Sequence, residues 1–210
     1  MTTRAAKPVQ RPPLTQQTIA SAALAILDSE GRAAFSLRNV AKRLGVSAPS
    51  LYTHVDGLDA LIDLIHKQIN SEIDVTLIDN PDHRVGLADF ARSYRGAYIR
   101  HSDGAALAIG RASQPSALRV YNALATCLTG MGVPPDAVLP LMVPLDHMIL
   151  GSAIIPFAPV FPAHGRVRAL GFPGLADSIK SSGRTRQVDN RGFEIGLAAW
   201  IDAVYDSIPR

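Results

Sequence analysis

The chain has 210 residues, of which 47% are hydrophobic and 19% are charged, which is enough apolar material for one large core or two small ones. Its formal net charge is only +3, but residues 1–56 carry seven basic and three acidic side chains, so a positive surplus suited to a polyanion lies at the N-terminal end. The single cysteine, Cys127, excludes an internal disulfide, and the polar first residues lack the apolar core of a signal peptide, so we expect a cytoplasmic protein.

Residues 1–13 are polar, basic and proline-containing, and they predict a flexible arm. Four helices are expected to follow, because four good N-cap residues each stand between two apolar residues spaced for a hydrophobic staple. These N-cap residues are Thr15, Ser36, Ser47 and Asp56. The first helix has an apolar stripe from Ile19 to Leu27, and Gly31 can end it in the left-handed conformation.

The second and third helices are short and meet at Gly45, which is typical of a helix-turn-helix unit whose second helix enters the DNA major groove. We expect polar and small side chains of both helices to face DNA: Arg38, Lys42, Ser47, Ala48, Ser50, Tyr52, Thr53 and His54. A helix-end histidine such as His54 is nearly as often a cap. The third helix lacks Arg, Asn and Gln, the strongest base readers, so Arg38 and the arm are expected to add contacts. The basic residues of the arm are Arg4, Lys7 and Arg11.

A fourth helix is predicted over residues 58–78, long enough to leave this unit and enter the rest of the chain. No strand pattern follows, and further helices are predicted over residues 84–101, 105–111, 116–131, 135–155, 175–181 and 191–208. The segments expected to be irregular are residues 156–174 and 182–190. The predicted fold is all-α with about nine or ten helices. Its parts are an arm (1–13), a three-helix DNA-binding domain (14–57) and a helical ligand-binding and dimerisation domain (58–210).

Residues 15–65 resemble the DNA-binding domain of the tetracycline-repressor (TetR/AcrR) family. The resemblance is carried by Phe35-Ser-Leu-Arg, Leu44-Gly-Val-Ser, Pro49-Ser-Leu-Tyr52 and His54-Val55, and the C-terminal Phe193-Glu-Ile-Gly-Leu-Ala-Ala-Trp-Ile is similar to the family's last helix. It implies a homodimeric repressor that a small molecule releases from DNA, with Tyr52 and His54 at positions that commonly contact phosphate. One departure is Leu58, which stands where a lysine commonly meets the DNA backbone.

A regulator of this kind needs a pocket, and aromatic walls with a few polar groups are typical of small-molecule sites, although such residues more often form ordinary core. The candidate pocket residues are His66, Phe90, Tyr94, Tyr98, Tyr121, Met142, His147, Phe157 and Phe161. Two adjacent polar residues, Asp146 and His147, interrupt an apolar helix and need partners if they are buried. We expect His147 to face the pocket and Asp146 to pair across a dimer interface.

The last helix repeats apolar residues at helical spacing, which at the end of a chain favours a contact with a second copy. We expect the interface to combine this helix with the one ending near residue 155, through Asp146, Ile149, Phe193, Leu197, Trp200 and Val204. A dimer suits DNA binding, because two recognition helices about 34 Å apart read a palindromic operator.

The favoured function is a repressor released from a palindromic operator by a small apolar or aromatic ligand; the alternative is a ligand-independent DNA-binding or architectural protein. An enzyme is not expected, because nucleophile-elbow, zinc-protease, dinucleotide and P-loop motifs do not occur in the sequence, and its six histidines lack the i, i+4 spacing of a metal site. The expected partners are double-stranded DNA, a small-molecule effector and a second copy of the chain, with no metal, cofactor or membrane.

Overall fold

The computed structural model describes residues 13–111, 114–155, 161–182 and 185–209, and within these ranges every regular element is a helix. The all-α prediction is confirmed, with eleven α-helices and two short 3-10 helices against an expectation of nine or ten helices. The basic residues of the predicted arm, Arg4, Lys7 and Arg11, fall outside the described residues.

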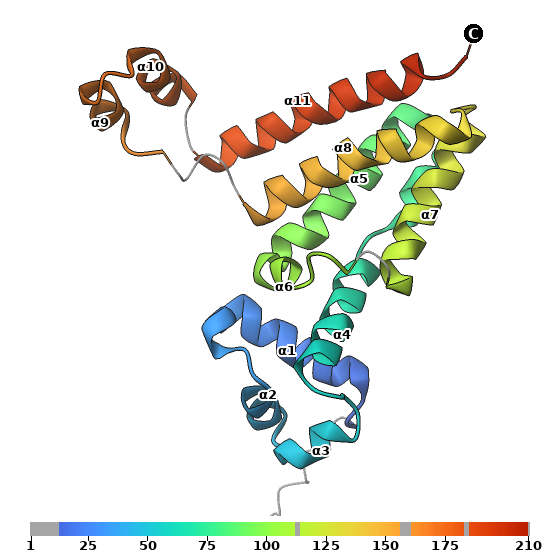
Figure 1. Ribbon diagram of the computed structural model, residues 1–210, viewed down its shortest axis with the longest axis vertical. Coiled ribbons are helices and arrows are strands. Elements are labelled where there is room, and N and C mark those ends of the chain that lie inside the picture. The colour runs from blue at the N-terminus through green and yellow to red at the C-terminus, as the bar shows by residue number, and fades with distance from the viewer. Residues whose placement is uncertain (1–12, 112–113, 156–160, 183–184, 210) are drawn as a thin grey trace, which may run out of the picture.

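The N-terminal unit, residues 13–57, lies at the bottom of Figure 1, and we call it the head. It contains α1 (Gln16–Glu30), the 3-10 helix η1 (Arg32–Ala34), α2 (Leu37–Leu44) and α3 (Ala48–Tyr52). Three predicted N-caps are confirmed, because the hydroxyls of Thr15, Ser36 and Ser47 accept hydrogen bonds from backbone N–H groups three residues ahead, at 3.1, 3.2 and 3.3 Å. Each cap satisfies a donor that the start of a helix leaves free.

The fourth N-cap prediction is wrong. The N-cap of α4 (Leu58–Ser71) is Gly57 and not Asp56, because the chain turns there with a φ of +97°, which residues with a Cβ rarely adopt. α4 also ends at Ser71 instead of residue 78. Beyond it, the Asp74 carboxylate accepts hydrogen bonds from the backbone N–H and the hydroxyl of Thr76 at 3.0 and 2.6 Å, which starts the separate 3-10 helix η2 (Val75–Asp79).

The described residues from 58 to 209 form a helical body above the head. After α4 it contains α5 (His83–Arg100), α6 (Ser102–Leu107), α7 (Pro115–Gly130), α8 (Pro135–Ile154), α9 (His164–Ala169), α10 (Pro173–Ser182) and α11 (Thr185–Asp206). α4 rises from the head into the body, α8 packs against both α5 and α11, and α9 and α10 project to one side (Figure 1). Two loop predictions are wrong, because α9 lies within residues 156–174 and α11 begins at Thr185; these stretches are too short or too polar to show a helical period.

One continuous apolar core joins the head to the body. Ile19 and Leu27 of α1, Ile65 of α4 and Phe90 of α5 all belong to it, and each is at most 1% exposed. α4 therefore shares its buried face with both units, which positions it to transmit a shift from one to the other.

By length and composition alone, α8 could cross a membrane. One face of α8 packs in the body, where Leu145 is only 1% exposed, while 28% of its apolar stretch is buried in the isolated chain. Two prolines, Pro140 and Pro144, lie inside α8 and lack the N–H that would reach a carbonyl four residues earlier. Between them, the indole Nε1 of Trp200 donates to the carbonyl oxygen of Leu141 at 2.7 Å and ties α11 to α8.

Candidate functional site

The turn between α2 and α3 fixes a short helix at the outer end of the head. Gly45 forms this turn in the left-handed conformation, with φ +67° and ψ +32°, and Leu51 is fully buried behind it. The hydroxyls of α3 are held locally: the Ser47 and Ser50 oxygens lie 2.7 Å apart, and Thr53 donates to the carbonyl oxygen of Ser50 at 2.8 Å. These contacts hold the polar side of α3 in one arrangement.

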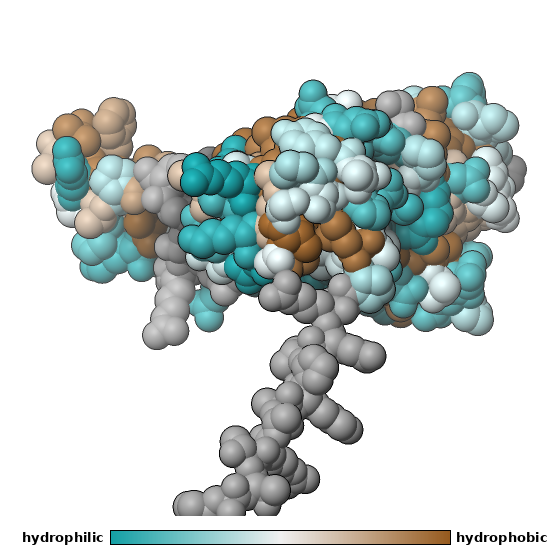
Figure 2. All heavy atoms as spheres, turned by 90° about the horizontal axis from the view of Figure 1, so that it is seen from below, coloured by the Kyte–Doolittle hydropathy of each residue, from teal (hydrophilic) through white to brown (hydrophobic). Residues whose placement is uncertain are grey.

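The structure brings the predicted DNA contacts together on α2, α3 and the residues flanking α3. Arg38, Lys42, Ser47, Tyr52 and Thr53 are exposed, and Ala48, Ser50 and His54 are half-buried. Tyr52 leaves 56% of its surface in solvent, so both its ring and its hydroxyl can reach a phosphate backbone. The view from below in Figure 2 shows mainly hydrophilic and intermediate residues at this end of the molecule, with a small apolar area among them.

The positive charge of the head is divided between paired and available cations. Arg32 pairs with Asp103 at 3.1 Å, and Arg43 pairs with Glu30 at 3.4 Å. Within the described part of the chain no ion pair engages Arg38 or Lys42, the two cations that sequence reasoning placed on DNA. These two side chains are therefore available for phosphates.

The start of α4 contributes no cation to this surface. Leu58 is 43% exposed where the family resemblance calls for a lysine, and it lies between the carboxylates of Asp56 and Asp59. Asp59 pairs with Arg111 at 3.0 Å, and Arg111 also pairs with Asp63 one turn along α4. Arg111 thus neutralises acidic charge on α4 close to the head.

A second group of predicted residues meets inside the body, between α5, α7 and α8. Phe90, Tyr94, Tyr121 and Met142 line a cavity of about 10 Å³, together with Val120, Leu124, Leu145 and Asp146. The hydroxyls of Tyr94 and Tyr121 both donate to Oδ1 of Asp146, at 2.9 and 3.1 Å. Burial, and then the charge of Asp146, raises the pKa of Tyr121 to about 12, and burial raises the pKa of Tyr94 well above its ordinary value. Both tyrosines therefore remain protonated donors.

A row of polar side chains, which we call the polar row, runs from this cavity to α4. It consists of Asp146, Tyr94, Tyr98, Asn70 and His66. The rings of Tyr94 and Tyr98 meet edge to face with centroids 5.1 Å apart, and the Tyr98 hydroxyl donates to Oδ1 of Asn70 at 3.0 Å. The Asn70 amide donates in turn to Nε2 of His66 at 3.0 Å, so Nε2 is the acceptor and the ring proton lies on Nδ1. That Nδ1 is buried and has no hydrogen-bond partner in the described residues. Burial, and then the charge of Arg111, lowers the pKa of His66, so the ring is held neutral.

Several core residues are placed differently from the prediction. Asp146, expected at the dimer interface, faces the tyrosines of the core, whereas His147, expected in the pocket, is exposed. The reason is helical geometry, since consecutive residues point about 100° apart and only one of the two can face inward. Phe161 lies just before α9 and outside the lining of the core cavity, and Phe157 falls outside the described residues. Asn70 was missed, although its position one turn after His66 was a usable signal.

The predicted dimer residues are buried within a single protomer. Ile149, Phe193, Leu197, Trp200 and Val204 are each at most 6% exposed, because the apolar stripe of each helix packs on the chain's own core. The prediction that they form the outer surface of α8 and α11 is therefore wrong. The outward faces of the same helices carry other residues, exposed in the isolated chain: Leu139, Val143 and Gly151 on α8, and Gly192, Ile195, Ala199 and Ala203 on α11.

Two family profiles match the chain. The family described as "Bacterial regulatory proteins, tetR family" matches residues 19–63, which cover most of the head and the start of α4. The family described as "Tetracyclin repressor-like, C-terminal domain" matches residues 79–206, which run from the end of η2 to the end of α11. The two matches follow the head and the body.

Individual relatives agree with these profiles along nearly the whole chain. The tetracycline repressor protein class E of Escherichia coli is 29% identical over 190 residues, 90% of this chain and 89% of that protein. An HTH-type transcriptional regulator of Saccharopolyspora erythraea is 28% identical over 204 residues, 90% of this chain and 86% of that protein. Apo ActR from Streptomyces coelicolor superposes with a TM-score of 0.74 and 26% identity, over 93% of this chain and 99% of ActR. The chain therefore belongs to the tetR family of bacterial regulatory proteins.

Proposed function

We propose that this protein is a homodimeric repressor that binds a palindromic operator and leaves it when a small aromatic ligand enters the core of the body. Residues 14–57 would bind DNA, and residues 58–210 would bind the ligand and form the dimer. The protein would act in the cytoplasm as a regulator and would not catalyse a reaction. The observation that carries this proposal is the row of polar side chains in the apolar core, which ends in an unpartnered N–H at His66 Nδ1.

The DNA-binding part rests on the exposed surface of α2 and α3. Arg38, Lys42 and Tyr52 suit phosphate contacts, which fix position, whereas Ser47 and Ala48 at the start of α3 suit base edges. Small side chains at that point let the helix approach the floor of the groove closely, but they discriminate each base weakly. Specificity would then come from the summed contacts of two heads on two half-sites.

The ligand-binding part rests on the chemistry of the core. An aromatic ligand would stack among Phe90, Tyr94 and Tyr121, and an acceptor oxygen on it would accept a hydrogen bond from the unpartnered Nδ1–H of His66. The cavity of about 10 Å³ holds no more than one water, so such a ligand must spread α5, α7 and α8. ActR has been solved in complex with (S)-DNPA and with actinorhodin, which supports a small-molecule ligand for a protein of this fold.

The dimer would use the outward faces of α8 and α11. Leu139 and Val143 are 67% and 50% exposed on α8, and Ile195 is 69% exposed on α11. Gly192, Ala199 and Ala203 lie along the same side of α11 and would let a second copy approach closely.

The proposal is tested in two steps. Operator duplexes are first selected from a random-sequence pool with the full-length protein, and palindromic half-sites one helical turn apart are expected. Actinorhodin and other polycyclic aromatic compounds are then screened by thermal shift, and those that stabilise the protein are added to the operator complex. Release of the DNA is expected for compounds whose binding depends on Asp146. These are the compounds that stabilise the wild type in the thermal shift assay but do not stabilise Asp146→Ala.

A ligand-independent DNA-binding protein is the second candidate, because the core cavity is nearly closed at about 10 Å³. It predicts the same operator selection, but no core-binding compound would release the DNA. The absence of any palindromic preference in the selected pool would contradict both candidates.

A further inference from the structure

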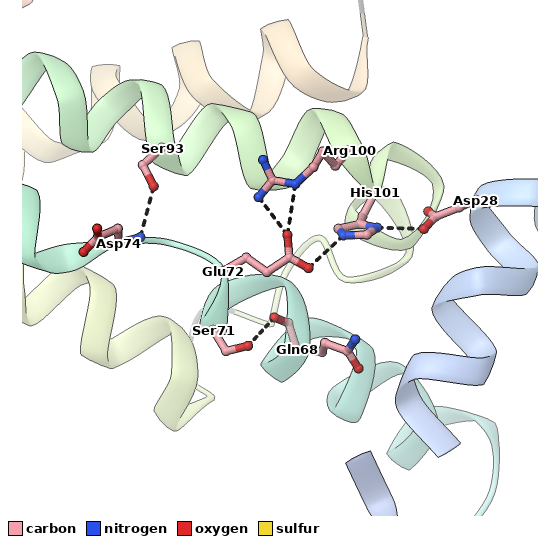
Figure 3. Close-up of polar contacts among 8 residues, drawn as sticks. All are labelled: Asp28, Gln68, Ser71, Glu72, Asp74, Ser93, Arg100 and His101. Carbon is pink, nitrogen blue, oxygen red and sulfur yellow. Dashed lines mark hydrogen bonds and ion pairs between the residues drawn. The ribbon is translucent and has the colours of Figure 1, made fainter. Parts of the chain in front are cut away.

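The junction between α5 and α6 holds a charged cluster that links the head to the body (Figure 3). The imidazole of His101, which lies between the two helices, contacts a carboxylate on each side. Its Nδ1 is 2.8 Å from Oδ2 of Asp28 near the end of α1, and its Nε2 is 2.9 Å from Oε1 of Glu72 at the end of α4. One ring therefore bridges the head to two helices of the body.

Donor counting defines the protonation state that fits this bridge. A neutral imidazole has one N–H, whereas an imidazolium has two, and an ionised carboxylate can only accept. Burial alone would raise the pKa of Glu72, but its hydrogen-bonded contacts, with Arg100 the foremost, lower this pKa on balance, so the carboxyl is ionised at neutral pH. Only the imidazolium can donate to Asp28 and Glu72 together. The ring is 15% exposed, so water is a poor substitute for either donor.

Further charged side chains belong to the same cluster. Facing His101 are Asp28 from α1, Glu72 from the end of α4, and Arg100 from α5, whose Nη2 lies 2.7 Å from Oε2 of Glu72. η1 and α6 add the pair Arg32–Asp103 at 3.1 Å. The cluster therefore combines the carboxylates of Asp28, Glu72 and Asp103 with the guanidinium groups of Arg32 and Arg100 and the imidazole of His101.

The cluster is mechanically connected to the ligand core. α6 packs tightly on α1 and α4, because a Cβ on Gly104 would lie 2.9 Å from Leu24 and 3.2 Å from Ile65. α5 carries Tyr94 and Tyr98 of the core along its length, and His101 follows its last residue. Spreading α5 to admit a ligand would therefore move His101 relative to Asp28 on the head.

From this arrangement we infer that His101, as an imidazolium shared between Asp28 and Glu72, is a positioning residue that holds the head on the body and makes operator binding sensitive to pH. A neutral ring has a single N–H, so one of the two carboxylates would lose its donor and the bridge would open on that side. The link to DNA rests on the proposed function, whereas the bridge itself does not.

The test uses full-length protein and two readouts, at about pH 6 and about pH 8.5, on either side of the range in which an imidazole titrates. The first is hydrogen–deuterium exchange of residues 16–34 without DNA, corrected for the intrinsic effect of pH. The second is affinity for the selected operator. The variants are His101→Gln, which cannot be protonated, His101→Arg, which keeps its charge, and Asp28→Asn, which removes the acceptor on the head. His83→Gln, an exposed histidine on α5, is the matched control.

In the wild type and in His83→Gln, protection of residues 16–34 is expected to fall about ten-fold at the higher pH, the size of one hydrogen bond to a charged group. His101→Gln and Asp28→Asn should show low protection at both pH values, and His101→Arg high protection at both. Operator affinity should follow the same order. His54 is another histidine on the proposed DNA-binding surface, so its contribution to operator affinity is measured separately with His54→Gln.

The inferred bridge would be overturned if the protection of residues 16–34 depended on pH to the same extent in the wild type and in His101→Gln. The same pH dependence in the wild type and in His101→Arg would also overturn it. Operator affinity that is identical in His101→Gln and His101→Arg at both pH values would overturn its role in positioning the head. If protection behaves as expected while no operator can be selected, the DNA-binding proposal fails and the bridge stands.

Discussion

The head and the body bury different kinds of side chain, and the difference indicates what each unit does. The buried residues of the head are apolar, as with Ile19, Leu27 and Leu51. The body buries His66, Asn70 and Arg95 in addition to its apolar residues, and it places tyrosine hydroxyls on a carboxylate. An aliphatic core offers a ligand no polar partner, whereas the polar row of the body includes one buried atom without a partner, His66 Nδ1, which an incoming group could satisfy. The head is suited to keeping its shape, and the body is suited to changing it.

The largest effect is expected from a cavity in the head. Leu51→Ala removes a fully buried side chain of α3 and should lower the free energy of unfolding by about 2–5 kcal/mol, because neighbouring residues relax only partly into the space. Urea denaturation followed by circular dichroism measures the loss. Leu58→Ala, at a position 43% exposed, is the control and should cost less than about 0.5 kcal/mol. Equal losses in both variants would contradict the assignment of Leu51 as the anchor of α3.

The core of the body should respond nearly as strongly to loss of its carboxylate. Asp146→Ala leaves the hydroxyls of the buried Tyr94 and the half-buried Tyr121 without this acceptor, and an unsatisfied buried group costs about 1–3 kcal/mol, so a total loss of about 2–4 kcal/mol is expected. The neighbouring exposed residue provides the control, because His147→Ala should change stability by less than about 0.5 kcal/mol. The reverse order of the two losses in urea denaturation would show that α8 is rotated relative to this account.

Acid should weaken the body through His66. Burial lowers the pKa of this ring in the folded protein, so below the ordinary imidazole range the unfolded chain binds a proton that the folded chain resists. The contribution to stability is therefore present above about pH 6.5 and is lost as the pH falls below it. Denaturation at pH 7.5 and pH 5, in the wild type and His66→Gln, measures the effect. His66→Gln should show a weaker loss in acid, and a stronger loss in the variant would contradict the prediction.

The smallest effect is expected at an available cation of the head. Lys42→Ala should weaken operator binding similarly for all sequences and reduce the salt slope of the binding constant by about one, because one phosphate contact is lost. Arg43→Ala is the matched control, since Arg43 is paired with Glu30 at 3.4 Å and should change the slope less. Fluorescence anisotropy at several salt concentrations distinguishes the two, and a larger slope change for Arg43→Ala would reverse their roles.

Local chemistry made the head predictable. An N-cap is defined by a residue and the N–H two or three positions ahead, so Thr15, Ser36 and Ser47 could be identified from a few neighbouring letters. The errors began where local signals compete. Asp56 is a residue type that often caps a helix, but Gly57 adopts a positive φ and is the N-cap of α4 instead. The end of α4 was misplaced because the Asp74 side chain caps a separate turn, η2.

The rotation of α8 and α11 could not be derived from the sequence. α8 is apolar on most of its surface, so its pattern does not indicate whether Asp146 or His147 faces the core, and packing with α5 and α7 decides it. In α11 the stripe through Phe193 and Trp200 shows which side is buried, but not whether its own chain or a second copy buries it. The wrong assignments on α8 and α11 therefore concern which face of each helix is buried and what buries it, and both depend on tertiary packing.

We expect that filling the core of the body releases the head from DNA. It is tested most directly by operator affinity in the presence of a polycyclic aromatic compound, such as actinorhodin, that stabilises the wild type but not Asp146→Ala in a thermal shift assay. Such a compound should weaken operator binding by at least about ten-fold in the wild type, equivalent to about 1.4 kcal/mol of coupling, and should not do so in Asp146→Ala. Unchanged operator affinity with the core occupied would contradict the account.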